Sequence, residues 1–285
     1  MVIRLGGALA LTFLLLAINP ARAAECPAAT GSVRTLAPKI TARPIVVGAA
    51  CAKGEIISGP SAGPHPGVLF VHWLGDPKTT NHTEFEADAV ALARRGVTSV
   101  LVDAMWSRED WFDKVGVSAE ADVAQASGQL AGLSAALDLL ERQKGIDPHR
   151  IAYVGHDFGA MFGALLAGDD PRPSYIVLMA GVPTLSEWYL LGKTHSQKDA
   201  YVRALDALDI TASLGRSKAK AFLFQFAAHD HYIAADRATA FAAASPLPRA
   251  VMTYDADHSL AVPQAAGDRR AWLLEHLFPP QARHG

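Results

Sequence analysis

The chain has 285 residues, of which 50% are hydrophobic, and its formal net charge is −2. A charge so close to zero gives no basis for binding nucleic acid or an anionic surface. The length suits one large domain with a substantial core, and no internal repeat, low-complexity linker or break in composition divides it.

The first 23 residues have the pattern of a secretory signal peptide. Arg4 precedes an apolar run over residues 5–18, and residues 21–23, Ala-Arg-Ala, form a small-x-small cleavage site. The run of about 14 apolar residues is short for a membrane span, so a membrane anchor is the less favoured alternative. We predict a mature domain of residues 24–285 that is secreted or periplasmic and not attached to a membrane.

The only two cysteines, Cys26 and Cys51, lie near the predicted mature N-terminus. An oxidising compartment would let them pair, so we predict a disulfide, with two inert thiols as the alternative. A catalytic role is not expected, because neither cysteine has a histidine or a helix start beside it.

Residues 43–59, RPIVVGAACAKGEIISG, alternate in a way that predicts two antiparallel edge strands. The turn after them contains GPSAG at residues 59–63, which fits the Gly-x-Ser-x-Gly pattern of serine nucleophiles. The prolines within and after this pentapeptide exclude the helix that must follow such a nucleophile. We therefore interpret Ser61 as a turn residue.

An uninterrupted apolar run, VLFVH at residues 68–72, is typical of a strand that is buried on both faces of a parallel sheet. Residues 85–95 have the spacing of an amphipathic helix that Gly96 ends, and residues 98–103 predict the next parallel strand. His72 stands at the end of its strand, where a histidine more often fixes the following loop than takes part in chemistry.

The segment AMWSREDWFDK, residues 104–114, follows this strand and carries Trp106, Trp111 and Phe112. Ligands of doubly wound sheets bind at the carboxyl ends of the strands. The tryptophans are therefore candidates for an apolar substrate pocket. An equally good interpretation is that they only cover the edge of the sheet.

A long helix over residues 120–144 precedes the central motif of the chain. Residues 151–154 predict a strand, apolar residues recur at helical spacing from Phe158 onward, and GHDFG lies between them at residues 155–159. A strand that enters a helix through such a glycine-flanked turn bends sharply and exposes its middle residue, the position of a nucleophile. The sequence therefore predicts Asp157 as the nucleophile, with an ordinary strand–glycine–helix turn as the alternative.

Residues 182–219 connect two further predicted strands and have room for two or three short helices, but not for a large cap. The segment contains Trp188, Tyr189 and Tyr201. These residues are candidates for the substrate pocket, although packing is the default role of such side chains.

The last part of the chain continues to alternate strands and helices. Its predicted strands are residues 174–180, 221–226 and 250–254, and its predicted helices begin at residue 234 and cover residues 264–277. This rhythm predicts an α/β fold with a mostly parallel twisted sheet and helices on both of its faces.

Two loops after these strands carry the remaining candidate catalytic residues. Asp230 follows the strand at residues 221–226, and His258 follows the last strand. The order of nucleophile, acid and histidine along the chain is that of the α/β-hydrolase triad, so we predict Asp230 as the orienting acid and His258 as the base. Asp103, at the end of an earlier strand, is a weaker alternative acid.

Four segments together, VLFVH, GHDFGA, AAHDHYI and DADHSL, resemble the dienelactone hydrolase branch of the α/β-hydrolases, over about residues 43–277. This resemblance implies a compact fold with little or no cap and the hydrolysis of small esters or lactones. It also implies an oxyanion hole made of two backbone N–H groups, those of Trp73 and Phe158. The chain departs from these relatives at Asp157, because they use cysteine or serine as the nucleophile.

GHDFG is similar instead to the elbow of epoxide hydrolases and dehalogenases of the same fold, in which aspartate attacks carbon. The sequence differs from both groups, since it has Phe158 where dehalogenases place tryptophan and offers only Tyr189 and Tyr201 as acids for an epoxide oxygen. Three functions stay open: an Asp-nucleophile hydrolase of small alkyl electrophiles, an ester or lactone hydrolase, and a ligand-binding homologue without catalysis.

No cofactor is expected for any of these functions. His229 and His231 flank Asp230 and offer a His-x-His metal site as an alternative role for this loop. Because Asp157 and His258 already account for the acid loop as part of a triad, we expect no metal.

Overall fold

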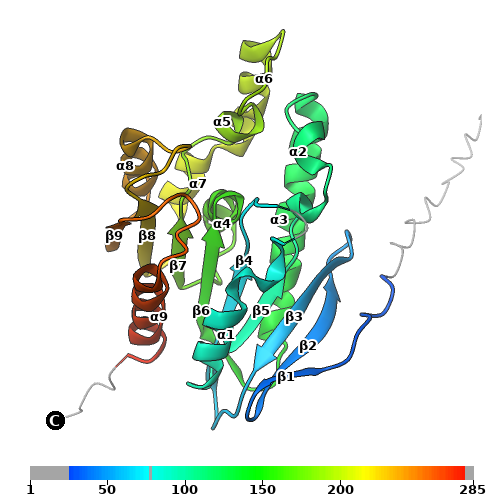
Figure 1. Cartoon of the computed structure of the whole chain (residues 1–285), viewed down its shortest axis with the longest axis vertical. Coiled ribbons are helices and arrows are strands. Elements are labelled where there is room, and N and C mark those ends of the chain that lie inside the picture. Colours follow the sequence, from blue (N-terminus) through cyan, green and yellow to red (C-terminus); the bar gives the residue numbers. More distant parts are fainter. Residues whose placement is uncertain (1–25, 77–78, 280–285) are drawn as a thin grey trace, which may run out of the picture.

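A nine-stranded sheet forms the centre of the computed structural model, which describes residues 26–76 and 79–279 (Figure 1). The strands lie in the order β1-β2-β3-β5-β4-β6-β7-β8-β9. Their bounds are β1 Arg34–Ala37, β2 Ile40–Val47, β3 Ala52–Ser58, β4 His65–Val71, β5 Thr98–Val102, β6 Ile146–His156, β7 Tyr175–Met179, β8 Ala221–Ala227 and β9 Arg249–Tyr254. The predicted signal peptide, residues 1–23, lies outside the described residues.

The strands from β4 to β9 run parallel to one another, and β1, β2 and β3 add an antiparallel edge. Every residue of β4 is buried, as the uninterrupted apolar run of its sequence predicts for a strand covered on both faces. The predicted mostly parallel sheet is confirmed. Strand β1 was not predicted, because its four residues, RTLA, are too few to show a period.

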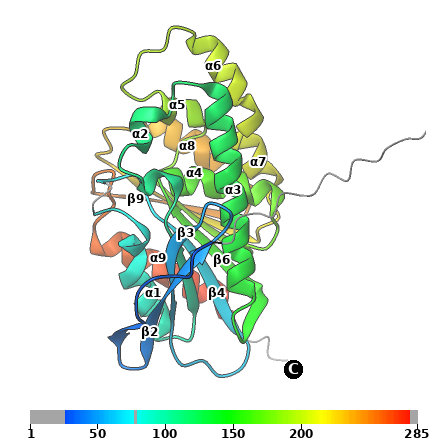
Figure 2. The same cartoon turned by 90° about the vertical axis from the view of Figure 1, so that its right-hand side faces the viewer.

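Helices cover both faces of the sheet (Figure 2). Helices α1 (Glu86–Ala93) and α9 (Pro263–Leu277) pack against each other and against one face, whereas α3 (Ala119–Glu141) and α4 (Phe158–Asp169) pack on the other. The remaining helices are α2 Trp111–Lys114, α5 Leu185–Tyr189, α6 Lys198–Leu205, α7 Ile210–Arg216 and α8 Ala235–Ala243, with 3-10 turns η1 His82–Phe85, η2 Met105–Ser107 and η3 Asp206–Leu208.

The segment predicted to hold two or three short helices forms α5, α6, η3 and α7. Together with α2, helices α5 and α6 lie at one end of the sheet (Figure 1). This small cover fits the expectation of little or no cap. None of the helices in residues 26–76 and 79–279 is long and apolar enough to span a bilayer.

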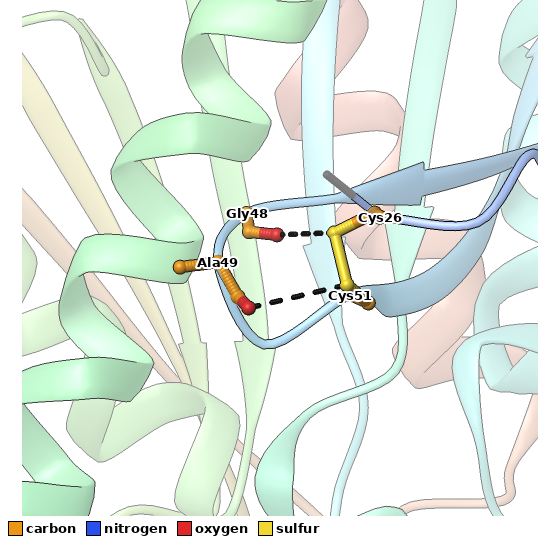
Figure 3. The surroundings of a disulfide bond; sticks show 4 residues. All are labelled: Cys26, Gly48, Ala49 and Cys51. Atoms are coloured by element: carbon orange, nitrogen blue, oxygen red, sulfur yellow. Dashed lines mark hydrogen bonds between the residues drawn. A yellow bond between two sulfur atoms is a disulfide. The ribbon is translucent and has the colours of Figure 1, made fainter. Parts of the chain in front are cut away.

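Cys26 and Cys51 form the predicted disulfide, which ties the segment before β1 to the turn between β2 and β3 (Figure 3). The two cysteines are 25 residues apart in sequence. A cross-link that closes a loop of this length stabilises a protein by about 3 kcal/mol, because it restricts the unfolded chain.

We therefore expect the double variant Cys26→Ser/Cys51→Ser to lose about 3 kcal/mol in its free energy of unfolding, measured by urea titration. The reduced parent protein serves as the control and should unfold at the same urea concentration as the variant. A variant as stable as the oxidised parent would contradict this expectation.

Candidate active site

Asp157 lies in the sharp turn between β6 and α4. Its backbone has φ 54° and ψ −115°, a strained conformation for a residue with a side chain. The flanking glycines permit the turn: a Cβ on Gly155 would lie 2.2 Å from the carbonyl oxygen of Gly159, and one on Gly159 would lie 2.3 Å from that of Val71. The GHDFG segment therefore adopts the strand–turn–helix geometry expected of it.

The structure brings the three predicted catalytic side chains together. Asp230 follows β8 and His258 follows β9, so both reach the same edge of the sheet as Asp157. His258 Nδ1 is 2.8 Å from Asp230 Oδ2, and His258 Nε2 is 3.9 Å from Asp157 Oδ1. Asp230 is itself fixed, since its Oδ1 accepts hydrogen bonds from the backbone N–H groups of Tyr232 and Ile233.

The residues that the sequence offered as alternatives for the acid, for a metal site and for a serine nucleophile make contacts elsewhere. Asp103 accepts hydrogen bonds from the backbone and ring of His82, not from His258. His229 pairs with Asp255 at the surface. Among the residues that the structure describes, no group of three or more His, Cys, Asp or Glu side chains could hold a metal ion. Ser61 is exposed in a turn that leads into β4 and not into a helix.

The two carboxylate oxygens of Asp157 have different surroundings. Oδ2 accepts a hydrogen bond from the backbone N–H of Leu74 at 3.0 Å, and the N–H of Phe158 adds a second favourable interaction with the carboxylate. Oδ1 is buried and has no hydrogen-bond partner in the described part of the chain. Oδ2 therefore lies against the backbone N–H of Leu74, while Oδ1 faces His258 without a hydrogen bond.

The first of these donors differs from the prediction by one residue. The N–H of Trp73 donates to Glu84 Oε2 at 2.8 Å and is not directed at Asp157. The next N–H along the chain, that of Leu74, donates to Asp157 instead. The sequence places the loop correctly, but it does not fix the direction of individual N–H groups.

Burial controls the protonation of the site. It raises the pKa of Asp157 from 3.8 to about 6, although the charge of His258 and the N–H of Leu74 counteract it. Burial by itself would lower the pKa of His258, but the hydrogen bond with Asp230 and the charge of Asp157 outweigh it and raise this pKa. Burial would raise the pKa of Asp230, yet the hydrogen bond with His258 holds it below its usual value. Asp157 and His258 each favour the charged form of the other, since the charge of His258 lowers the pKa of Asp157 and the charge of Asp157 raises that of His258.

Aromatic rings enclose the site around Phe158. Trp111 lies edge-on to this ring at 5.1 Å between centroids, and Trp188 and Tyr189 each lie at 5.9 Å. Trp188 also packs on His258 at 5.3 Å. Trp111 Nε1, Trp188 Nε1 and the Tyr189 hydroxyl are buried without a hydrogen-bond partner among the described residues. Three potential donors thus lie in the aromatic cluster beside Asp157 and His258.

Two other predicted pocket residues have structural contacts. Trp106 is buried against Phe158, and its Nε1 donates to the carbonyl oxygen of His72. Tyr201 donates its hydroxyl hydrogen to Asp122 Oδ2, which links α6 to α3. The prediction that Tyr201 lines the substrate pocket is not supported, since a partner of opposite polarity at 2.7 Å already fixes its polar end.

His72 has the structural surroundings expected of it. Its Nδ1 contacts the carbonyl oxygen of Trp73, and its Nε2 accepts from the N–H of Ala104. These contacts join the loop after β4 to the loop after β5. His72 therefore supports the loop that carries the Leu74 donor.

The reactive groups are closed off from solvent. Asp157 is 1% exposed and His258 6%. Tyr232, which is more than half exposed, packs edge-on against His258 at 5.2 Å. Tyr232 and Trp188 thus pack over His258 beside the buried carboxylate of Asp157.

Comparison with solved structures identifies the fold as that of the α/β-hydrolases. The acetyl xylan esterase from Paenibacillus sp. R4 is similar with a TM-score of 0.68 and 16% identity, over 87% of this chain and 89% of that one. The 2,6-dihydroxy-pseudo-oxynicotine hydrolase gives 0.63 and 17%, over 83% and 68%. A puromycin-hydrolyzing peptidase of Mycobacterium tuberculosis gives 0.66 and 16%, over 87% and 41%.

No protein-family model matches the sequence, and no curated protein matches it. The structural neighbours share so little sequence with this chain that the likeness defines the fold alone. What the protein does must be inferred from its own site.

Proposed function

We propose that the protein is a hydrolase in which Asp157 attacks the sp³ carbon of a small alkyl electrophile, an epoxide or a carbon–halogen bond. The observation that supports this proposal is that the two carboxylate oxygens of Asp157 have different contacts. Oδ2 accepts the N–H of Leu74, and Oδ1 has no hydrogen bond and is directed toward His258. A carboxylate held in this way has one oxygen ready to attack.

In the first step a lone pair of Oδ1 forms a bond to carbon, and the bond to the leaving group breaks. Halide departs as an anion, whereas an epoxide oxygen takes up the proton of the His258 imidazolium. The enzyme becomes an alkyl ester of Asp157. This ester carries no charge, so the interaction with ionised Asp157 that raises the pKa of His258 disappears, and His258 gives up its proton more readily. In the haloalkane reaction that proton passes to solvent, which leaves His258 neutral for the second step.

In the second step neutral His258 removes a proton from water, and the resulting hydroxide adds to Cγ of Asp157. The negative charge of the tetrahedral intermediate develops on Oδ2, where the N–H of Leu74 stabilises it. Collapse breaks the bond between Cγ and the alkylated oxygen. The alcohol leaves with a proton, and the carboxylate is restored.

The buried donors of the aromatic cluster support a leaving group beside it. An indole N–H only donates hydrogen bonds, and those of Trp111 and Trp188 are not used by other described residues. Tyr189 can donate in the same way, and burial keeps its hydroxyl protonated by raising its pKa well above the usual value. A departing halide or alkoxide oxygen can accept from these donors.

Ordinary ester hydrolysis fits the site less well. Oδ2 of Asp157 occupies the donors that would hold the carbonyl oxygen of an ester, and attack of a carboxylate on an ester would give a mixed anhydride of high energy. Hydrolysis of esters or lactones is nevertheless the second candidate, because two of the similar structures are acetyl xylan esterases. In that reaction Asp157 and His258 would activate water instead of attacking carbon.

A single turnover in ¹⁸O-labelled water tests the proposal. The parent enzyme, in excess over a substrate drawn from small epoxides, primary haloalkanes and activated esters, should release alcohol that contains unlabelled oxygen. The label should appear in the peptide that carries Asp157, because water adds to Cγ and not to the substrate. Label in the alcohol released from an epoxide or haloalkane would show that water attacks the substrate directly and would contradict the proposal. Label in the acid released from an ester, with none in the peptide that carries Asp157, would support the second candidate. Binding without turnover would support a non-catalytic role.

A further inference from the structure

A buried carboxylate–imidazole pair outside the triad connects the three loops that form the site. Glu84 belongs to η1, and its Oε1 lies 2.7 Å from Nδ1 of His156, the last residue of β6. His156 is fully buried, and the side chain of Glu84 is 17% exposed. Neither residue has a role in the proposed chemistry.

Each member of the pair also holds backbone next to a catalytic group. Glu84 Oε2 accepts the N–H of Trp73, the residue before the Leu74 donor. His156 precedes Asp157, and its Nε2 lies 3.0 Å from the main-chain carbonyl oxygen of His258. The ring of Trp73 stacks on His156 at 5.3 Å with an interplanar angle of 14°. The pair therefore touches the donor loop, the elbow and the histidine loop at once.

The hydrogen bonds of His156 require a shared proton. A carbonyl oxygen can only accept, so Nε2 must donate to His258. The contact between Nδ1 and Glu84 then needs a proton of its own, which makes the pair either imidazolium and carboxylate or imidazole and carboxylic acid. Positive charge on His156 also favours ionised Asp157, the form that attacks.

We propose that Glu84 and His156 are positioning residues, which set the Leu74 N–H against Asp157 Oδ2 and hold His258 at its distance from Asp157. The three segments that they join come from distant parts of the chain, and loops of this kind are individually mobile. The inference rests on the proposed function, because it assigns the pair to the hydrolysis of the alkyl ester.

The two half-reactions depend on the pair to different extents. Attack by Oδ1 needs no donor at Oδ2, whereas hydrolysis of the ester places a full negative charge on Oδ2. Loosening the Leu74 loop should therefore slow the second step more than the first. An enzyme with this defect accumulates the alkyl ester during turnover, whereas an enzyme that is only less stable has fewer active molecules with an unchanged ester fraction.

The test compares Glu84→Ala with Glu84→Gln, and Glu86→Ala serves as the matched control. Glu86 lies two residues away and pairs with Arg34 outside the site. We expect Glu84→Ala to lower kcat about 10- to 100-fold and KM in parallel, because a slower second step holds enzyme as the ester, with a higher ester fraction per folded enzyme by intact-protein mass. Glutamine can accept from Trp73 and donate to His156, so Glu84→Gln should remain within about threefold of the parent. The control should match the parent.

Two outcomes would overturn the inference: parent-like kcat in Glu84→Ala, or a loss of kcat without a rise in the ester fraction. Proton NMR tests the pair independently of chemistry. A slowly exchanging, strongly downfield ring N–H signal of His156 is expected in the parent and should be lost in both Glu84 variants, and its absence from the parent would count against the shared proton. If no ester forms in any protein while this signal is present, the proposed function fails and the assignment of the pair to ester hydrolysis fails with it, but the shared proton stands.

Discussion

Substitution His258→Ala is expected to stop the reaction after its first half. At a pH above its pKa of about 6, Asp157 is ionised and needs no base to activate it, so attack on the electrophile should continue. Hydrolysis of the ester should nearly cease, because no other base is directed at Asp157. We expect kcat to fall on the order of 10³-fold, within the range typical of general-base catalysis.

The measurement is the mass of the intact variant after incubation with each substrate. An epoxide should add its whole mass to the enzyme, and a haloalkane its mass less that of the hydrogen halide. Peptide mapping should place the group on Asp157. His229→Ala is a matched control, since this exposed histidine lies in the neighbouring acid loop and pairs with Asp255. A group attached elsewhere, or on His229→Ala to the same extent, would contradict the mechanism.

The rate at which the ester forms in His258→Ala should also depend on pH. It should fall as the pH drops below the pKa of Asp157, because the protonated carboxyl group does not attack. In the parent protein the charge of His258 lowers this pKa. Removal of the imidazole should therefore move the acid limb of the profile to higher pH than the value of about 6 in the parent.

The sequence was sufficient to predict the sheet and the close approach of Asp157, Asp230 and His258, because both depend on local patterns. Apolar runs mark the parallel strands, and the glycines of GHDFG mark the turn at Asp157. Asp230 and His258 could be assigned because the carboxyl ends of parallel strands meet at one edge, so residues after different strands come together.

The sequence could not predict the directions in which individual backbone N–H groups and side-chain hydroxyls point. The Leu74 donor differs from the predicted Trp73 by one residue, a distinction that arises only when Glu84 binds the N–H of Trp73. Tyr201 lies near the predicted cover, yet a hydrogen bond to Asp122 from another helix fixes its hydroxyl. Such contacts join segments far apart in the chain, and no spacing of residues reveals them.

The contact between Glu84 and His156 could not be predicted from the sequence for the same reason. Glu84 lies in an amphipathic segment where a carboxylate would ordinarily face solvent, and His156 is the variable position of the elbow motif. Only the folded arrangement places them 2.7 Å apart. The histidine directly before the predicted nucleophile was the one feature of the sequence that could have drawn attention to this pair.

Substitution Asp157→Asn is expected to abolish hydrolysis and, at the same time, to stabilise the protein. Asparagine has no charged oxygen to attack carbon, so activity should fall on the order of 10⁴-fold or more. Burial raises the pKa of Asp157 from 3.8 to about 6, which means that the ionised carboxylate destabilises the folded state. A shift of this size corresponds to about 3 kcal/mol, of which an unsatisfied amide would cancel about 1 kcal/mol.

The effect of Asp157→Asn on the free energy of unfolding should depend on pH. The folded state holds the proton of Asp157 more tightly than the unfolded chain does, so its stabilising contribution is complete below about pH 4 and is lost as the pH rises through about 6. The variant should therefore exceed the parent by about 2 kcal/mol in urea titrations at pH 8 and lie about 1 kcal/mol below it at pH 4, where only the cost of the amide remains. Asp230→Asn provides a control of opposite sign, because the pKa of Asp230 is lowered in the folded state and the variant should lose stability at pH 8. Equal stability of Asp157→Asn and the parent at pH 8 would show that the elbow carboxylate is not held at an energetic cost, which would remove the reason to regard it as an activated nucleophile.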